Sequence, residues 1–431
     1  MDSRLRGNDD VEKISCPAIL VSAPASGQGK TMVAAALARA WRNQGLTVQA
    51  FKCGPDFIDS MILQAATGRP VYNLDLGMCG LEDGKAQLYR AAQEADVIIA
   101  EGVMGLYDGT PSTADIAKTF GLPVALVIDA SGMAQTFAAV AHGLYDFDSA
   151  LIKAGVIANK VGNAGHAGML QKALPASTPW LGALQKDERF SLPERHLGLH
   201  LAQEITDIDA RIAAAADILA TDLALPPAVT FDAPTLQNLP KLLQGKTIAV
   251  AKDAAFCFIY PANIDCLKSL GAEIIYFSPL TDNMLPEAHA YWLPGGYPEL
   301  HLDKISQNKS MQQSLQNAAK TGKPILAECG GMMALGETLN GVPMFGLLEG
   351  HSEIQTKFQG LGTQHLETPN GKIGAHTFHY GKFDTPTEPN NIATGRYGKG
   401  EAVYKQGYIT ASFLHFYFPS NPAFAAQLFL P

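Results

Sequence analysis

The feature that most constrains the fold is a glycine-rich loop, Ser26–Thr31, placed between an apolar run and a helical stretch. The apolar run is Ala18–Val21, and the helical stretch is the Ala-rich segment from Lys30 to Asn43. A loop of this kind binds phosphate when a strand leads into it and a helix N-terminus leaves it. The pattern therefore predicts an α/β domain with a parallel sheet. Pro24 departs from the standard loop, which has glycine at that position.

Short runs rich in Val, Ile and Ala continue through the N-terminal half, and helical stretches separate them. Such runs are typical of buried parallel strands in βαβ units. They are Val48–Phe51, Val97–Ala100, Val124–Ile128 and Gly155–Ala158. A segment with three prolines and no periodicity, residues 224–245, predicts a linker. The same alternation resumes beyond it. We therefore expect a frayed N-terminus over residues 1–15 and domains over residues 16–223 and 246–431.

Length and composition favour two globular domains. The chain has 431 residues, of which 47% are hydrophobic and 17% charged, and this length exceeds one compact core. The formal net charge of -9 argues against a nucleic-acid binder. No apolar run reaches the ~18–20 residues of a membrane span, and no signal core follows the polar residues 1–10. The six cysteines include no C-x-x-C pair, so we expect a reduced, cytoplasmic protein without structural zinc.

The glycine-rich loop predicts a site for ATP and Mg²⁺. Backbone N–H groups of the loop and of the helix N-terminus can bind phosphate oxygens. Lys30 can reach the outer phosphates, and the Thr31 hydroxyl can bind Mg²⁺. Asn159, at the end of a later strand candidate, could read an adenine edge or form a turn. The expected ATP-binding residues are Ser26, Gly27, Gln28, Gly29, Lys30, Thr31 and Asn159.

Carboxylates follow two other strand candidates. Asp56 and Asp59 end the segment Lys52–Asp59, and Glu101 follows Val97–Ala100. Ligands of open α/β sheets bind at the carboxyl ends of the strands, where Mg²⁺ takes one or two carboxylates. We therefore expect Glu101 and one of the two aspartates as metal ligands, with Thr31, Asp56 and Glu101 as the preferred set. Loop capping is the alternative role for any single Asp.

A second strand–turn–helix pattern predicts a nucleophile at Cys329. The apolar pair Ile325–Leu326 leads into it, and Gly330 and Gly331 allow the sharp turn of a nucleophile elbow. The N-terminus of the following helix should lower the pKa of the thiol. A buried structural cysteine is the alternative.

The partners expected for this thiol are a base and a set of oxyanion donors. His415, just beyond the strand candidate Tyr408–Phe413, is the expected base, with His376 and His379 as rivals. Backbone N–H groups next to the thiol can stabilise an oxyanion. The expected donors are those of Gly295, Gly296 and Gly330.

These segments together resemble the cobyrinic acid a,c-diamide synthase family of cobalamin biosynthesis, over nearly the whole chain. The segments that carry the resemblance are Ser26–Thr31, Lys52–Asp59, Glu101–Gly109, Leu293–Leu300, Glu328–Met333 and Ala411–Phe418. The resemblance implies an α/β fold with two domains. A P-loop NTPase-like parallel-sheet domain, similar to dethiobiotin synthetase, is followed by a class I glutamine amidotransferase domain of flavodoxin-like α/β architecture.

The resemblance also implies the reaction. ATP and Mg²⁺ would activate the a and c acetates of a cobyrinate-type corrinoid, with Asp59 and Asp108 near the substrate carboxylate. Cys329 and His415 would release ammonia from glutamine. Neither nucleic acid nor a membrane is an expected partner, and a homodimer stays open. Other glutaminases have a Glu two residues after the base, where this chain has Tyr417.

Four alternatives are compared at the sequence level. Hydrogenobyrinate and nickel-sirohydrochlorin diamide synthases would differ mainly in the macrocycle. CTP synthase is longer and has the His-x-Glu element that this chain lacks. A partitioning ATPase would share the P-loop but has no need of a Cys329–His415 pair.

Overall fold

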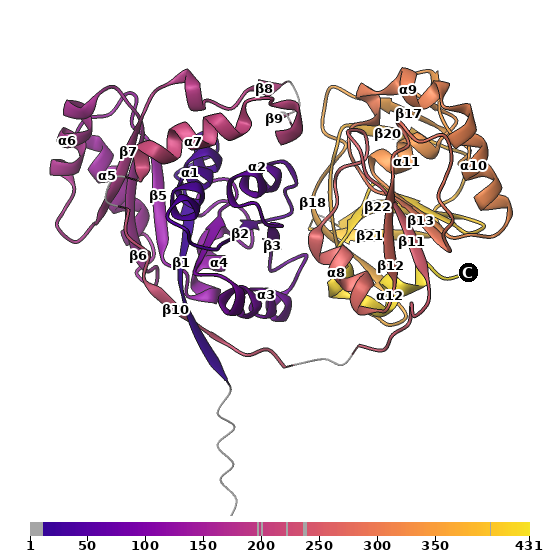
Figure 1. The fold of residues 1–431 in the computed structure, drawn as a ribbon, viewed down its shortest axis with the longest axis horizontal. Coiled ribbons are helices and arrows are strands. Elements are labelled where there is room, and N and C mark those ends of the chain that lie inside the picture. The colour runs from indigo at the N-terminus through magenta and orange to yellow at the C-terminus, as the bar shows by residue number, and fades with distance from the viewer. Residues whose placement is uncertain (1–11, 196–197, 200, 221–222, 236–238, 397) are drawn as a thin grey trace, which may run out of the picture. The chain divides into compact units, whose positions relative to one another are not determined.

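The computed structural model describes residues 12–195, 198–199, 201–220, 223–235, 239–396 and 398–431. Contacts divide the chain into two compact units (Figure 1). The first unit comprises Met1–Leu76 and Leu81–Leu236, and the second comprises Gly77–Gly80 and Gln237–Pro431. Most of the expected frayed N-terminus, residues 1–11, lies outside the described residues. The rest of it differs from expectation, because the first strand already begins at Lys13.

The first unit is built on an eight-stranded sheet in the order β3-β2-β4-β1-β5-β6-β7, with β10 paired to β1. The pairs along this order are parallel, and only β10 runs antiparallel. Its strands are β1 (Lys13–Ser22), β2 (Val48–Cys53), β3 (Tyr72–Leu74), β4 (Val97–Glu101), β5 (Val124–Asp129), β6 (Lys153–Val161), β7 (Trp180–Gln185) and β10 (Ala228–Asp232). A separate two-stranded ribbon consists of β8 (Glu194–Arg195) and β9 (Gly198–Leu199).

Helices cover both faces of this sheet, because neighbouring residues of a strand point to opposite faces. In β1, Ile19 and Val21 pack in the cluster that holds α1, α2 and α7, whereas Ala18 and Leu20 pack with α3 to α6. The helices are α1 (Lys30–Asn43), α2 (Ile58–Thr67), α3 (Leu81–Glu94), α4 (Thr113–Phe120), α5 (Thr136–Asp146), α6 (Ala164–Ala173), α7 (Ile208–Leu219), and the 3-10 turns η1 (Glu188–Phe190) and η2 (Ala202–Glu204).

Strand β10 lies inside the segment expected to be a linker. Its residues pair with the start of β1, from Lys13 opposite Asp232 to Pro17 opposite Ala228. The prolines that suggested a linker flank this strand rather than interrupt it, since Pro226 and Pro227 precede it and Pro234 follows it. The contact boundary between the units falls later, between Leu236 and Gln237.

The second unit contains a ten-stranded sheet in the order β12-β11-β13-β14-β23-β22-β21-β18-β19-β24. The first five strands are parallel and, numbered along the chain, have the order 2-1-3-4-5 of flavodoxin-like sheets. The strands of this sheet are β11 (Thr247–Ala251), β12 (Glu273–Phe277), β13 (Ala290–Leu293), β14 (Ile325–Glu328), β18 (Gly360–Thr368), β19 (Gly371–His379), β21 (Asn391–Gly395), β22 (Gly398–Gln406), β23 (Ile409–Ser412) and β24 (His415–Phe416).

The remaining elements of the second unit flank this sheet. A small sheet consists of β15 (Thr338–Leu339), β16 (Val342–Pro343), β17 (His351–Ile354) and β20 (Gly381–Asp384). The helices are α8 (Pro261–Ser269), α9 (Leu302–Gln307), α10 (Lys309–Lys320), α11 (Gly330–Leu335), α12 (Pro422–Gln427), and the 3-10 turns η3 (Pro298–Leu300) and η4 (Phe418–Ser420). One core cluster lies against α9, α10 and α11, and another lies against α8 and α12.

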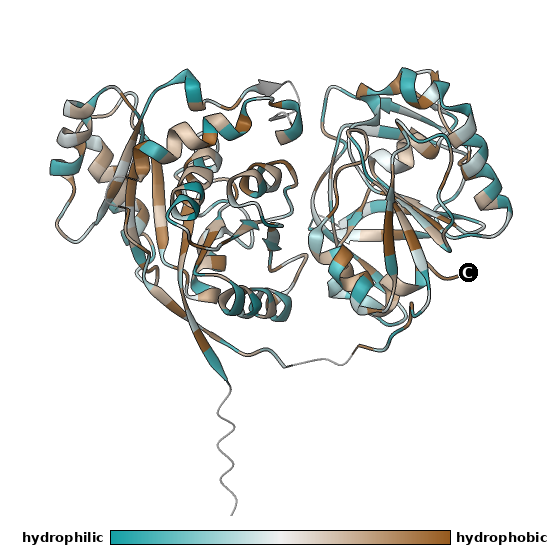
Figure 2. Cartoon of the chain, viewed as in Figure 1, coloured by the Kyte–Doolittle hydropathy of each residue, from teal (hydrophilic) through white to brown (hydrophobic). Residues whose placement is uncertain are grey.

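The hydropathy of the chain follows this layering. The central strands of both sheets carry apolar colours, whereas the outer faces of helices such as α3 and α10 carry polar ones (Figure 2). Within the described ranges, no helix is long and apolar enough to cross a membrane. The six cysteines are free thiols. The predicted fold class, a P-loop-type parallel-sheet domain followed by a flavodoxin-like α/β domain, is confirmed.

Candidate functional site

The glycine-rich loop joins β1 to α1 and depends on two left-handed glycines. Gly27 has φ 77° and Gly29 has φ 85°. A Cβ at Gly29 would overlap the Nδ2 atom of Asn159, so a larger residue does not fit there. That Nδ2 atom donates to the Gln28 carbonyl at 2.8 Å, and Gln28 Oε1 accepts from the Asp129 N–H at 2.8 Å. The Asn159 amide therefore holds the loop, and its expected adenine contact stays a prediction.

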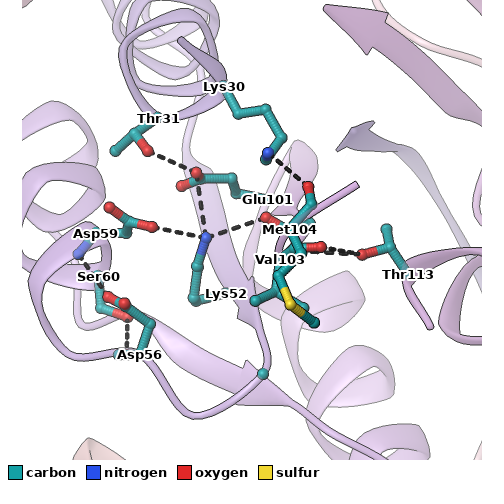
Figure 3. Close-up of polar contacts among 12 residues, drawn as sticks. Lys30, Thr31, Lys52, Asp56, Asp59, Ser60, Glu101, Val103, Met104 and Thr113 are labelled. Carbon is teal, nitrogen blue, oxygen red and sulfur yellow. Dashed lines mark hydrogen bonds and ion pairs between the residues drawn. The ribbon is translucent and has the colours of Figure 1, made fainter. Parts of the chain in front are cut away.

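The Lys30 side chain is held by two backbone carbonyls next to the loop. Its ammonium donates to the carbonyl of Ala25 at 3.1 Å. It also donates to the carbonyl of Met104 at 2.6 Å (Figure 3). Met104 is one of the few non-glycine residues with positive φ, at 52°. Burial, and then the charge of Lys52, lowers the pKa of Lys30. A phosphate placed in the loop would meet a partly desolvated cation.

A buried charge cluster lies at the carboxyl ends of β2 and β4 (Figure 3). The Thr31 hydroxyl donates to Glu101 Oε1 at 2.7 Å. Lys52 Nζ lies 2.8 Å from Asp59 Oδ2 and 3.2 Å from Glu101 Oε1, and it donates to the Gly102 carbonyl at 3.1 Å. The structure thus brings together the expected residues Thr31, Asp59 and Glu101 around a lysine.

Lys52 had no assigned role at the sequence level. The available signal was a lysine directly after the apolar strand candidate Val48–Phe51, which extends to Cys53 in the structure, since lysine is almost never fully buried unless it is paired. Burial opposes its charge, but Asp59 and Glu101 override that effect and raise the pKa of Lys52. This side chain is therefore a fixed cation between two carboxylates.

Glu101 has one oxygen that the described residues leave without a hydrogen-bond partner. This atom, Oε2, is buried, while Oε1 accepts from Thr31. Burial raises the pKa of Glu101 to about 7, although the positive charge of Lys52 opposes the shift. A buried, unpartnered carboxylate oxygen costs free energy unless a cation or donor faces it. The atom therefore has the chemistry of a cation ligand.

The other expected carboxylates have local roles in the structure. Asp56 Oδ1 accepts from the Asp59 N–H at 2.7 Å, which is the capping interaction left open for a single Asp. Burial and the charge of Asp59 raise the pKa of Asp56 to about 6. Asp108 Oδ2 accepts from the Gly105 N–H at 3.0 Å and so shapes its own loop. Their expected roles toward metal and substrate stay predictions.

The second site is centred on Cys329, which sits between β14 and α11 with φ 47° and ψ −108°. A positive φ at a non-glycine residue is strained, and it is the backbone form of a nucleophile elbow. Hydrogen bonds fix the turn, because the Cys329 N–H donates to the Ser412 carbonyl at 2.8 Å and its carbonyl accepts from Met333 N–H at 3.0 Å.

Glycines let three chain segments meet at this turn. A Cβ at Gly295 would overlap the His415 ring and would lie 3.3 Å from Cys329 Cβ. A Cβ at Gly330 would lie 2.8 Å from the Gly296 carbonyl oxygen and 3.0 Å from the Gly296 nitrogen. The structure therefore brings the expected nucleophile, base and oxyanion glycines together.

His415 belongs to the short strand β24, which pairs with β19 so that His415 lies opposite His376. The two imidazole centroids are 6.2 Å apart. Burial lowers the pKa of His415 well below its usual range, and His376 and His379 contribute. Burial also lowers the pKa of His376, to about 3. A neutral imidazole at His415 can accept a proton at neutral pH.

The rival histidine His379 is held by other groups. Its Nε2 atom lies 3.0 Å from Glu401 Oε1, its Nδ1 atom lies 2.8 Å from the Gly381 carbonyl, and its ring stacks on Phe413 at 3.8 Å. Both ring nitrogens therefore have partners. His415, which lies against Gly295 beside the thiol, is the better base on geometry.

The expected net lowering of the thiol pKa is wrong. Burial raises the pKa of Cys329, and the carboxylate of Glu299 raises it further. The Gly330 N–H does lower it, as expected of a helix N-terminus, but α11 begins inside the core and the burial effect exceeds the dipole. The thiol must therefore pass its proton to a base as it attacks.

Two buried polar residues near this site were missed at the sequence level. Glu328 precedes the nucleophile, and its oxygens accept from Trp292 Nε1 at 2.9 Å and the Phe416 N–H at 2.8 Å. Burial raises the pKa of Glu328 to about 8, against the effect of these two hydrogen bonds. Asn263 on α8 donates to the Phe416 carbonyl at 2.7 Å and accepts from the Phe418 N–H at 2.8 Å.

Comparison with known proteins matches both halves of the chain to known domain families. Residues 19–199 match the family described as CobQ/CobB/MinD/ParA nucleotide binding domain, and residues 247–423 match the CobB/CobQ-like glutamine amidotransferase domain. The chain is 52% identical to hydrogenobyrinate a,c-diamide synthase of Stutzerimonas stutzeri, over 97% of this chain and 99% of the relative. The chain belongs to the a,c-diamide synthase family.

Other relatives in the same family are named for one of two substrates, hydrogenobyrinate or cobyrinate. The Pseudomonas aeruginosa relative, a hydrogenobyrinate a,c-diamide synthase, is 48% identical over 96% of this chain and 98% of its own length. The Herminiimonas arsenicoxydans relative, a cobyrinate a,c-diamide synthase, is 47% identical over 96% of both chains. An a,c-diamide synthase of this family is a glutamine-hydrolysing amidotransferase, which accounts for a nucleotide site and a thiol site in one chain.

Proposed function

We propose that this a,c-diamide synthase uses ATP and glutamine to amidate the a and c acetates of a cobyrinate-type macrocycle in cobalamin biosynthesis. The observation that carries the proposal is a nucleophile elbow at Cys329, with His415 against the same glycine, in a chain that also folds a phosphate-binding loop. A partitioning ATPase would have no use for the Cys329 site, and the match to an amidotransferase domain argues against that alternative.

Mg²⁺ fits the first site. Glu101 Oε2 is buried without a hydrogen-bond partner, and the Thr31 hydroxyl lies beside the same carboxylate. Among the residues that the structure describes, no group of three or more His, Cys, Asp or Glu side chains could hold a metal ion. One or two carboxylates, a hydroxyl and phosphate oxygens make a set that suits Mg²⁺. Thr31, Glu101 and Asp56 would hold the ion, which would neutralise charge on the phosphates of ATP.

The first unit would activate the substrate carboxylate. Lys30 would leave the carbonyls of Ala25 and Met104 to bind the phosphates of ATP. A substrate carboxylate oxygen then attacks the terminal phosphorus, ADP leaves, and an acyl phosphate forms. Ammonia attacks the acyl carbon, and inorganic phosphate leaves with its oxygen. Asp59 and Asp108 would lie near the carboxylate that reacts.

The second unit would supply the ammonia. His415 accepts the thiol proton of Cys329 while the sulfur attacks the side-chain amide of glutamine. The N–H groups of Gly295, Gly296 and Gly330 would stabilise the oxyanion. His415 then returns the proton to the departing ammonia, and water hydrolyses the thioester to glutamate.

The macrocycle is the least constrained part of the proposal. Hydrogenobyrinate is the second candidate, because the relatives at 52% and 48% identity are named for it. Nickel-sirohydrochlorin is a further alternative without such support. The expected homodimer and cytoplasmic location, and the domain boundaries 16–223 and 246–431, stay predictions.

Mass spectrometry of a coupled assay tests this function. Purified protein would be incubated with ATP, Mg²⁺ and glutamine, and with either cobyrinic or hydrogenobyrinic acid. We expect two successive mass decreases, each equal to the difference between a hydroxyl and an amino group, and each dependent on ATP. No change with either macrocycle, alongside intact glutamine hydrolysis, would overturn the substrate assignment and direct the search to sirohydrochlorin-type acids.

A further inference from the structure

Glu328 connects the nucleophile strand to the strand of the base. It is the last residue of β14, and Cys329 follows it. Its side chain is 1% exposed and has both oxygens within hydrogen-bond distance of a donor, Trp292 Nε1 on β13 and the Phe416 N–H on β24. The chemistry of glutamine hydrolysis described above does not use this carboxylate.

Strand β24 is the last of the ten strands of the sheet, next to β19, while β14 is the fourth. A hydrogen bond of the Glu328 side chain nevertheless joins β14 to β24. No backbone pairing of β14 with β24 occurs among the strand pairs of the described residues. The side chain of Glu328 on β14 therefore links the two strands by accepting from the Phe416 N–H of β24, in place of backbone hydrogen bonds between them.

Asn263 binds the backbone of the same residue, Phe416, through its carbonyl. Its amide donates to the Phe416 carbonyl at 2.7 Å and accepts from the Phe418 N–H at 2.8 Å. It is 1% exposed. Glu328 and Asn263 therefore fix the N–H and the carbonyl of the residue that directly follows His415.

Other glutaminases have a Glu two residues after the base, and this chain does not. The position two residues after His415 is Tyr417, whose ring packs on Tyr260 with centroids 5.8 Å apart. The backbone that carries the imidazole contributes to its orientation. We propose that Glu328 and Asn263 are positioning residues, which orient His415 toward Cys329 by holding the backbone N–H and carbonyl of Phe416.

The inference rests on the proposed glutaminase function, and kinetics of variants of the full-length enzyme test it. A glutamine side chain has one acceptor oxygen, whereas glutamate has two. In Glu328→Gln the amide N–H₂ group therefore faces one of the two donors, Trp292 Nε1 or the Phe416 N–H. A misplacement of about 1 Å costs roughly 10²-fold in rate. We therefore expect kcat for glutamine hydrolysis to fall by about 10- to 100-fold in Glu328→Gln and Asn263→Ala. KM for glutamine and ammonia-dependent synthesis should stay near wild type.

Trp292→Phe is the matched control. It removes the other donor to Glu328 and loosens the core, yet leaves the hydrogen bond from Phe416. We expect it to lower the melting temperature while keeping kcat for glutamine hydrolysis within about threefold, because a shift of that size is under 1 kcal/mol. Iodoacetamide labelling of Cys329 at neutral pH should slow in Glu328→Gln and not in Trp292→Phe.

Two results would overturn the proposal. One is an unchanged kcat in Glu328→Gln or in Asn263→Ala. The other is a loss of ammonia-dependent synthesis in proportion to glutamine hydrolysis, which would mean that the substitutions only damage the fold. A wild-type enzyme that is folded but hydrolyses no glutamine would instead contradict the proposed function itself.

Discussion

At the scale of single residues, the buried ion pairs of Lys52 carry a stability prediction. Lys52→Met leaves the carboxylates of Asp59 and Glu101 facing each other in the core without a cation. Loss of one partner from a buried pair costs about 3–5 kcal/mol. We expect the free energy of unfolding of the first unit to fall by about that amount in urea titrations.

Lys13→Met is the control for this prediction. Lys13 and Asp232 form an exposed pair at 3.4 Å, and such pairs contribute about 0–1 kcal/mol. If the two variants lost similar amounts of unfolding free energy, burial of Lys52 would not determine how much Lys52→Met destabilises the protein.

The thiol pKa gives a second residue-scale prediction. The charge of Glu299 raises the pKa of Cys329, so Glu299→Gln should lower that pKa and increase the thiolate fraction at any pH below it. We expect faster alkylation of Cys329 by iodoacetamide at mildly alkaline pH, followed by peptide mass spectrometry. Glu353→Gln, at an exposed site on β17, should leave the rate unchanged. A slower reaction in Glu299→Gln would contradict the electrostatic argument.

Single residues also show which parts of the sites a local sequence pattern can predict and which parts it cannot. Lys30, Glu101 and Cys329 can be predicted because each lies at the end of a strand or just after the loop that follows one, in a pattern of glycines. A local pattern therefore determines their surroundings. Glu328 and Asn263 gave no such signal. Their partners lie 88 and 153 residues away, so their roles depend on which strands meet in the folded chain.

At the scale of elements, the phosphate loop offers a matched pair of glycines. Gly27 and Gly29 both have positive φ, but only a Cβ at Gly29 meets another group, the Asn159 amide. A non-glycine residue in such a conformation costs about 1–3 kcal/mol. We expect Gly29→Ala to lower stability and ATP affinity more than Gly27→Ala, since it also displaces the amide that holds Gln28. Calorimetric titration with ATP and thermal unfolding would measure both effects. Equal losses would contradict the role of Asn159.

The pairing of β19 with β24 predicts an acid-sensitive second unit. The pKa of His376 is lowered to about 3, and that of His415 also lies below its usual range. Below pH ~6.5 the unfolded chain binds protons that the folded chain does not, so stability falls as pH falls. The loss approaches about 1.4 kcal/mol per pH unit for each histidine.

The measurement is urea unfolding of the second unit between about pH 7.5 and about pH 5. His376→Asn should reduce the pH slope, and His289→Asn, at an exposed site, should not. A slope that is the same in wild type and His376→Asn would mean that this histidine is protonated in the folded protein.

Elements differed in how well the sequence predicted them. The parallel strands are short apolar runs followed by glycine turns, and the α1 bounds match the Ala-rich stretch from Lys30 to Asn43. The antiparallel strands β18 and β22 contain many polar residues and take their positions from pairing, which a single-sequence pattern does not report. The flanking prolines and the lack of periodicity predict a linker where β10 forms, and its partner β1 lies some 200 residues earlier, beyond the reach of a local pattern.

At the scale of the whole molecule, each of the two units carries the groups proposed for one half-reaction. The phosphate loop, Lys52 and Glu101 belong to the first unit, and the thiol, its histidine and its glycines belong to the second. Ammonia is the only species that the second unit must supply to the first in the proposed reaction. Free ammonia in solution should therefore replace glutamine and the second unit together.

Cys329→Ala tests this division of labour. The substitution removes the nucleophile from a buried turn and leaves the groups of the first unit in place. We expect glutamine-dependent synthesis to disappear, and ammonia-dependent synthesis with ATP to persist near the wild-type rate, as measured by mass spectrometry of the macrocycle. Cys266→Ala, on α8 of the same unit, should keep both activities. If Cys329→Ala loses ammonia-dependent synthesis while its unfolding transition is unchanged, the thiol takes part in both half-reactions, and the two units do not act as separate catalysts.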